Sequence, residues 1–136
     1  MTERMPHEIL HPRHWKRAKG YANGIAAEGR TIFVAGQVGW NAEQQFDSAD
    51  FVAQTRQALE NVVAVVREAG GVPEHITRLT WYILDKAEYM SRLGEVGEAY
   101  RAVMGRHFPT MSMVQVVALI EDEAKVEIEA TAVVPV

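Results

Sequence analysis

The sequence predicts an α+β protein in which two helices cover one face of a mixed β-sheet. Two observations carry this prediction. Segments with strand patterning flank and separate two long segments of helical periodicity, and the 136 residues, 48% hydrophobic and 24% charged, suit one globular domain. The expected order of elements is β-β-α-β-α-β-β. We expect residues 1–19 to form an N-terminal arm and residues 20–136 to form the single domain.

The arm is rich in His, Arg, Lys and Pro without periodicity, which predicts mostly irregular structure. A short strand is expected over residues 21–27, and the β-branched and aromatic run over residues 31–38 predicts a longer one. The turn residues between them predict that these two strands form a hairpin. Gly36 interrupts the second strand, and a glycine inside a strand is typical of a bulge or of a place that a ligand approaches closely.

Residues 50–69 carry apolar side chains at helical spacing, and a Gly-Gly pair ends this predicted helix. Residues 75–84 predict a strand that is buried on both faces. Trp81 and Tyr82 lie on opposite faces of that strand, so one of them is expected to pack beneath a helix and the other at a subunit interface.

Asp85 followed by Glu88 is a capping-box pattern that predicts the start of a second helix, which ends at Gly105. Gly94 and Gly97 lie inside this helix, where a glycine costs about 1 kcal/mol relative to alanine. We therefore expect their small size to serve close packing of the helix against the sheet.

The last quarter of the chain predicts two long strands joined by an acidic turn between Ile120 and Ala124. Direct antiparallel pairing of these strands would place Val114 opposite Ala130 and would make one face of the hairpin wholly apolar. The other face would carry apolar and charged side chains together. We expect any chemistry to lie near this second, mixed face.

On the mixed face, Glu127 is a candidate general base or water-binding group, and it shares the face with Glu129. The alternative is that an exposed strand simply carries these charges into solvent. Met111 and Met113 are expected on the same face, where methionine either serves adaptable packing or lines an apolar cleft together with Tyr21 or Trp40.

Two helices can cover only one face of a sheet of about five strands. Apolar residues of the last two strands, including Met111, Met113, Val117 and Leu119, are left over for the other face. A monomer would then expose a large apolar patch. Homo-oligomerisation through the uncovered face is therefore expected, with a ligand site between subunits.

Composition excludes several classes of function. A formal charge of −4 with scattered basic residues gives no footprint for nucleic acid, and the absence of cysteine excludes disulfides, thiolate nucleophiles and zinc-thiolate sites. The five histidines lack metal-ligand spacing, so no metal site is expected. No segment has the pattern of a signal peptide or of a membrane span, so we expect a cytoplasmic protein without membrane contact.

Four runs, taken in order, form a recognisable combination: Gly20-Tyr-Ala-Asn-Gly24, Val34-Ala-Gly-Gln37, Gln54-Thr-Arg-Gln-Ala-Leu-Glu-Asn-Val62 and Val126-Glu-Ile-Glu-Ala-Thr-Ala132. Together they resemble the RidA family, also called YjgF or L-PSP, over residues 20–134. The resemblance implies a chorismate-mutase-like fold and a homotrimer whose sheets form a central barrel, with three ligand clefts between subunits. It also implies hydrolysis of reactive enamines or imines to a carbonyl compound and ammonia, without a metal or an organic cofactor.

Within this resemblance, Tyr21 matches the tyrosine that walls the cleft, Gly36 the glycine whose backbone meets the ligand, and Glu127 the glutamate that holds the attacking water. The sequence departs from the family where active deaminases have Pro-Ala-Arg-Ser. Met111 stands in place of the arginine that binds the substrate carboxylate, and Met113 stands where cysteine is common. A thioether cannot replace a bidentate guanidinium contact.

The resemblance therefore predicts an enamine or imine deaminase with an altered substrate. The wider family includes deaminases of aminomuconate-type intermediates, so a compound of that type is a candidate. The alternative is a trimer that binds a small metabolite and has lost deaminase activity. A ribonuclease or translation inhibitor, which older names of the family imply, is disfavoured by the acidic charge balance.

Overall fold

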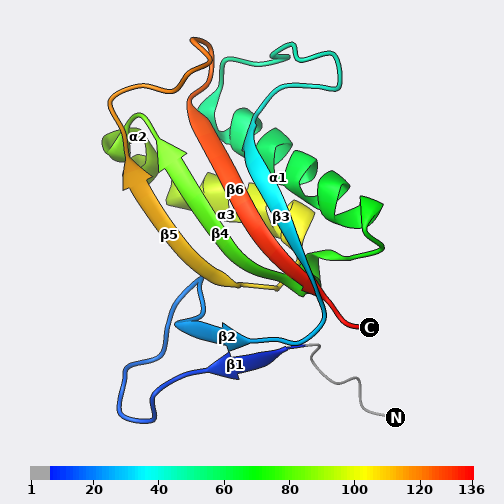
Figure 1. Cartoon of the computed structure of the whole chain (residues 1–136). Coiled ribbons are helices and arrows are strands. Elements are labelled where there is room, and N and C mark those ends of the chain that lie inside the picture. Colours follow the sequence, from blue (N-terminus) through cyan, green and yellow to red (C-terminus); the bar gives the residue numbers. More distant parts are fainter. Residues whose placement is uncertain (1–6) are drawn as a thin grey trace.

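A computed structural model describes residues 7–136. Three helices cover one face of a four-stranded mixed sheet and leave the other face open, so the α+β prediction is confirmed (Figure 1). The elements in chain order are β1 (Glu8–Leu10), β2 (Gly24–Ala26), β3 (Arg30–Val38), α1 (Phe51–Glu68), a short 3-10 helix (Pro73–His75), β4 (Ile76–Ile83), α2 (Lys86–Ser91), α3 (Leu93–Met104), β5 (Thr110–Gln115) and β6 (Val126–Val134).

The predicted pairing of the last two strands is wrong. The strand order is β3-β6-β4-β5, in which β6 pairs antiparallel with β3 and β4, while β5 pairs only with β4 and in parallel. Residues 116–125 therefore carry the chain across the end of β4. Alternation of apolar residues specifies which residues of a strand share a face, but it does not specify the neighbouring strand.

Because β4 lies between β5 and β6, the side chains of β5 and β6 that share a face differ from those predicted. Trp81 of β4 pairs with Met113 on one side and with Ile128 on the other, so these three residues share the face beneath the helices. Tyr82 pairs with Glu127 and belongs to the open face. The predicted mixed face that joins the methionines to the glutamates is therefore wrong.

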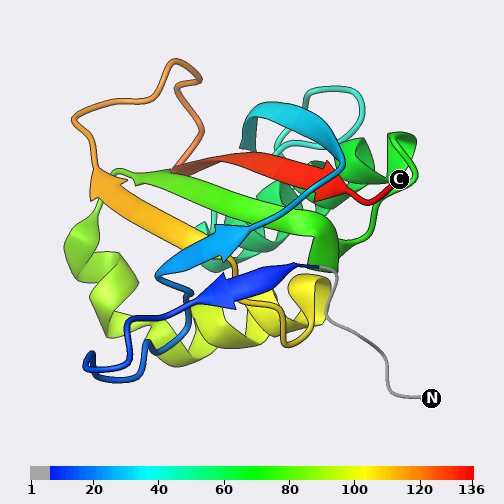
Figure 2. The ribbon, with the colours of Figure 1, turned by 60° about the horizontal axis from the view of Figure 1, so that its bottom comes forward.

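The predicted N-terminal hairpin is also wrong. β2 is only three residues long and pairs with β1, which lies in the arm expected to be mostly irregular, and neither strand joins the main sheet. Residues 1–6 of that arm lie outside the described part of the chain. The small sheet lies beside the end of the main sheet at which β4 and β5 begin (Figure 1, Figure 2). Ala22 bridges to Thr110 there, and this contact directs the segment away from β3.

The two predicted helices form where the sequence expects them. The Asp50 carboxylate accepts the N–H of Ala53 at 3.0 Å and begins α1, and Asp85 does the same for Glu88 at 3.0 Å in α2. The second helix is interrupted at Arg92, so it forms α2 and α3. The helices bury one core against the sheet: Val34, Phe51, Ala58, Leu59, Val62, Val63, Val66, Ile76, Leu79, Trp81, Ile83, Val96, Tyr100, Met104, Val126, Ile128, Ala130 and Ala132.

Close packing at the glycines of α3 was expected, and at Gly94 this expectation is wrong. A Cβ atom on Gly94 would meet no atom within 4 Å, and one on Gly97 would meet only the side chain of Arg101. The absence of side chains at these positions therefore leaves space beside α3.

The open face of the sheet is mixed in character, which corrects the predicted distribution of apolar groups. Met111 and Met113 pack on the helix side, and Val117 lies fully exposed in the loop before β6. Phe33, 81% exposed, is the large apolar group that β3 presents to solvent. Within residues 7–136, no helix is long and apolar enough to cross a membrane.

Candidate functional site

Glu127 and Gly36 come together on the open face, where the strand has the bulge that the sequence predicts for an interior glycine. The register of β3 against β6 shifts between Val34 and Gln37, which places the bulge at Gly36. The Glu127 side chain lies directly over this glycine, because a Cβ atom built there would be 2.9 Å from the Glu127 Cδ atom and closer still to Oε2. No other residue type would leave room for the carboxylate in this position.

The two glutamates of β6 differ in their partners. Tyr82 donates its hydroxyl to Glu129 Oε1 at 2.6 Å, and this bond raises the pKa of Tyr82. Within the described part of the chain, the Glu127 carboxylate makes no hydrogen bond or ion pair. Glu127 is therefore the carboxylate of this face whose oxygens are available to water or to a ligand.

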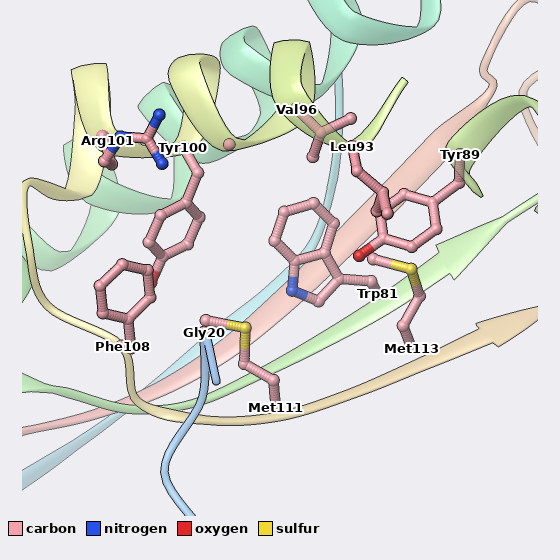
Figure 3. Close-up of a pocket in the computed structure, with 11 residues that line it drawn as sticks. Gly20, Trp81, Tyr89, Leu93, Val96, Tyr100, Arg101, Phe108, Met111 and Met113 are labelled. Atoms are coloured by element: carbon pink, nitrogen blue, oxygen red, sulfur yellow. The ribbon is translucent and has the colours of Figure 1, made fainter. Parts of the chain in front are cut away.

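A pocket of about 350 Å³ lies on the other side of the sheet, between α2, α3 and the edge formed by β4 and β5. Figure 3 shows the side chains that converge on it from these elements and from the loop before β2. Aromatic and aliphatic groups dominate, and Arg101 supplies a guanidinium. The lining residues are Gly20, Trp81, Tyr89, Leu93, Val96, Gly97, Tyr100, Arg101, Phe108, Met111 and Met113.

One wall of this pocket is a row of aromatic rings. The ring centroids of Trp81 and Tyr100 are 6.3 Å apart with an interplanar angle of 26°, and those of Tyr100 and Phe108 are 5.2 Å apart at 13°. Tyr100 donates its hydroxyl to the carbonyl oxygen of His107 at 2.5 Å, and burial raises its pKa. Trp81 is 3% exposed, and among the described residues its Nε1 has no hydrogen-bond partner.

The predicted site residues therefore fall into separate groups. Gly36 and Glu127 meet on the open face, whereas Met111 and Met113 line the pocket beneath the helices. Tyr21 follows Gly20 of the pocket lining but is itself 44% exposed and borders a neighbouring hollow with Trp15, His11 and Arg106.

Trp40 lies apart from the pocket. It follows the end of β3, where its ring contacts Phe46 at a centroid distance of 5.9 Å and its carbonyl oxygen accepts the side-chain amide of Asn61 at 2.9 Å. This position is two residues beyond Val38, whose backbone pairs with that of Glu127. Trp40 is therefore not among the residues that line the pocket with the methionines.

Sequence reasoning did not assign the aromatic groups of the pocket to a site. The predicted alternation of Trp81 and Tyr82 is confirmed, since Trp81 is buried beneath the helices and Tyr82 lies on the open face. Nothing in the pattern, however, distinguishes a core tryptophan from one that borders a cavity. The glycines of α3 were the available signal, because they indicate a place where side chains are missing.

The described residues contain no group of three or more His, Asp or Glu side chains arranged to hold a metal ion. The histidines of positions 7, 75 and 107 lie near one another, but His7 and His107 direct ring nitrogens to the backbone carbonyl oxygens of residues 75 and 76, at 3.2 and 2.7 Å. These rings therefore fasten the chain at the start of β4.

Comparison with known proteins gives the same family that the sequence motifs indicate. The family model described as Endoribonuclease L-PSP matches residues 13–134. A 2-iminobutanoate/2-iminopropanoate deaminase of Escherichia coli is 35% identical over 116 residues, which cover 83% of this chain and 86% of that protein.

Solved structures agree with this result. The Rid-family protein YyfB of Yersinia pestis, described as of unknown function, has a TM-score of 0.85 and 30% identity, covering 96% of this chain and all of that one. TdcF of E. coli, solved with bound serine, has a TM-score of 0.66 and 32% identity, covering 93% and 98%. This chain belongs to the L-PSP family, the group that includes the RidA and YjgF proteins.

Proposed function

We propose that this protein is an enamine or imine deaminase with a substrate different from the 2-imino acids named for its E. coli relative. The observation that carries the proposal is the unpaired Glu127 carboxylate held over the Gly36 backbone. The resemblance to RidA proteins assigns this pair to water and substrate binding. The 35% identity to a named deaminase supports the reaction class.

The reaction needs one water molecule and one proton carrier. Glu127 would accept a hydrogen bond from water and take its proton as the oxygen attacks the imine carbon, which forms the new C–O bond. The same group can then deliver the proton to the nitrogen. The remaining proton of the new hydroxyl group then passes to the nitrogen as the C–N bond breaks, which releases ammonia and leaves the carbonyl product, so atoms and charge balance without a cofactor.

One chain alone cannot bring Glu127 and Met111 to the same ligand, because they lie on opposite faces of the sheet. We propose a homotrimer in which the open face of one subunit meets the β5 edge of the next. Glu127 and Gly36 from one subunit would then face the pocket of its neighbour. The exposed Phe33 on the same face supports burial of that face in an assembly.

Met111 is the reason to expect a changed substrate. A methionine at this pocket position offers an apolar thioether where the deaminases of the family have a guanidinium, so a carboxylate would lose its partner there. We therefore expect hydrolysis of neutral imines to exceed hydrolysis of 2-imino acids. The same substitution also fits the alternative of a metabolite-binding trimer without catalysis.

The test follows the decay of two imines generated in situ by amine or amino-acid oxidases, acetophenone imine without a carboxylate and 2-iminopropanoate with one. The protein should accelerate decay of the neutral imine. Glu127→Gln should lower that rate by about 100-fold or more, the usual contribution of a general acid–base group. Glu129→Gln is the matched control, and it should retain most of the activity because Glu129 is occupied by Tyr82.

Two results would favour the binding protein over the enzyme. One is that neither imine decays faster than in buffer. The other is that Met111→Arg creates hydrolysis of 2-iminopropanoate in a chain that was inactive before the change. If Glu127→Gln and Glu129→Gln lose activity equally, the assignment of the water-binding role to Glu127 is wrong.

A further inference from the structure

The indole Nε1 of Trp81 is the buried side-chain polar atom that folding leaves without a hydrogen-bond partner, within residues 7–136. The residue is 3% exposed, and its Nε1 makes no hydrogen bond. A buried donor without an acceptor costs about 1–3 kcal/mol, so protein cores seldom contain one. In Figure 3 the nitrogen lies on the edge of the ring that faces Gly20 and Met111.

The surroundings of Trp81 limit what could accept this hydrogen bond. The neighbouring Tyr100 hydroxyl donates to the carbonyl of His107 and makes no hydrogen bond with the indole. The remaining walls near the indole are the rings of Tyr89 and Phe108 and the side chains of Met111 and Met113. None of these groups makes a hydrogen bond with the indole within the described residues, and the pocket volume of about 350 Å³ lies at the small end of the usual range for ligand pockets.

We propose that Trp81 Nε1–H is a specificity-determining donor for a small neutral ligand with an aromatic or other planar apolar body and one carbonyl or imine acceptor. The apolar body would lie beside the aromatic row of Trp81, Tyr100 and Phe108, and the acceptor would receive the indole proton. This inference rests on the proposed function, because it names the class of substrate that the pocket takes.

The methionines make such a complex sterically accessible. Met111 and Met113 are unbranched side chains that change rotamer at low cost, so the thioethers can move aside when a ligand enters. At the Met111 position, the pocket offers no partner for a carboxylate. Arg101 projects from α3, in the part of the lining formed with Gly97, and is not part of the aromatic floor around Trp81.

The experiment observes the pocket directly in the full-length protein by NMR. Acetophenone serves as the probe, and α-methylstyrene, which has nearly the same shape but a CH₂ group in place of the oxygen, is its control. Methyl-labelled methionine reports whether a probe occupies the pocket, and the indole N–H resonance of Trp81 reports hydrogen bonding. Trp15→Phe and Trp40→Phe identify the Trp81 resonance by elimination, so the core residue itself stays unchanged.

Acetophenone should shift the methyl signals of Met111 and Met113 and move the Trp81 N–H resonance downfield. Its analogue α-methylstyrene should shift the methyl signals only and bind about tenfold more weakly, the factor that corresponds to about 1.4 kcal/mol for one hydrogen bond. Pyruvate should leave both sets of signals unchanged, since it has the acceptor but carries a carboxylate in place of an apolar body.

Three results would overturn the inference. The first is equal binding of acetophenone and α-methylstyrene with an unmoved Trp81 resonance. The second is that neither probe enters the pocket, and the third is that pyruvate binds as acetophenone does. Loss of deaminase activity alone would not produce any of these results, so failure of the proposed function can be distinguished.

Discussion

Glu127 and Glu129 are two residues apart on one strand and share a face, yet their surroundings give them different partners. Tyr82 holds Glu129, whereas Glu127 lies unpaired over a glycine. Sequence alternation identifies both carboxylates as neighbours but cannot distinguish them. The difference comes from β4 and β3, which lie on either side of β6 and are distant from it in the chain.

Gly36→Ala tests the contact between the glycine and the carboxylate. The added methyl group would overlap the end of the Glu127 side chain, which can rotate away, so the variant should fold with little change in melting temperature. Deamination should fall by a factor comparable to that of Glu127→Gln, because the carboxylate is displaced. Gly94→Ala is the matched control, since its new methyl group meets no atom within 4 Å, and it should keep activity while stabilising the fold by about 0.4–1 kcal/mol.

The buried His107 should make the stability of the fold depend on pH. Burial lowers its pKa from the ordinary value of 6.5, and burial also lowers the pKa of His75. The unfolded chain therefore takes up protons first as the pH falls. The free energy of unfolding should have its full value above about pH 6.5 and should decrease below that pH.

Urea unfolding at pH values from 8 to 5, on the wild type and on His107→Gln, measures this effect. The glutamine can still donate to the carbonyl of Ile76 but does not titrate, so the loss of stability at low pH should become smaller. His14→Gln, at an exposed position, should leave the pH dependence as it is. An unchanged slope in the His107 variant would contradict the assignment.

At the scale of elements, Gln54 connects helix α1 to the loop that precedes β6. It is 1% exposed and donates to the carbonyl oxygens of Ser48 and Glu123, each at 3.0 Å, while its own oxygen accepts the N–H of Lys125 at 2.8 Å. The helical pattern alone places Gln54 among surface residues. Its burial follows only from the loop that returns over α1.

Gln54→Leu should lower the free energy of unfolding by about 3 kcal/mol, because three backbone groups lose their partner in a buried place. Chemical denaturation measures the loss. Gln57→Leu is the control on the same helix, where the amide bonds only to Asn61 and the expected cost is below about 1 kcal/mol. Equal effects of the two variants would show that Gln54 does not hold the loop.

At the scale of the whole molecule, the open face of the sheet is the surface that we propose for contact between subunits. Phe33 is 81% exposed there and lies across from Thr131, near Arg78 and Glu129. We expect light scattering on a sizing column to give three times the chain mass of 15.2 kDa for the wild type.

Phe33→Asp should reduce this mass to that of a monomer, because a charge at a buried apolar contact is costly. Deaminase activity should fall with it, since the two halves of the site would separate. Met90→Asp, at a position 54% exposed on α2, should change neither the mass nor the activity. A monomeric wild type that retains activity would refute the shared site.

The sequence by itself determined the α+β class, the order of the main elements from β2 to β6 apart from the division of the second helix, the helix start at Asp85 and the family. These depend on local spacing, on short-range hydrogen bonds and on motifs that lie along the chain. The bulge at Gly36 belongs with them, because a glycine inside a strand already indicates it.

Only the tertiary structure decided which strands are neighbours, and with them which side chains meet. Strand alternation has a period of two, so the insertion of β4 between β5 and β6 was enough to place Met111 and Glu127 on opposite faces. The pocket beneath α3 and the unpaired indole of Trp81 likewise arise from packing between segments far apart in the chain. Patterns within one segment carry no information about such contacts.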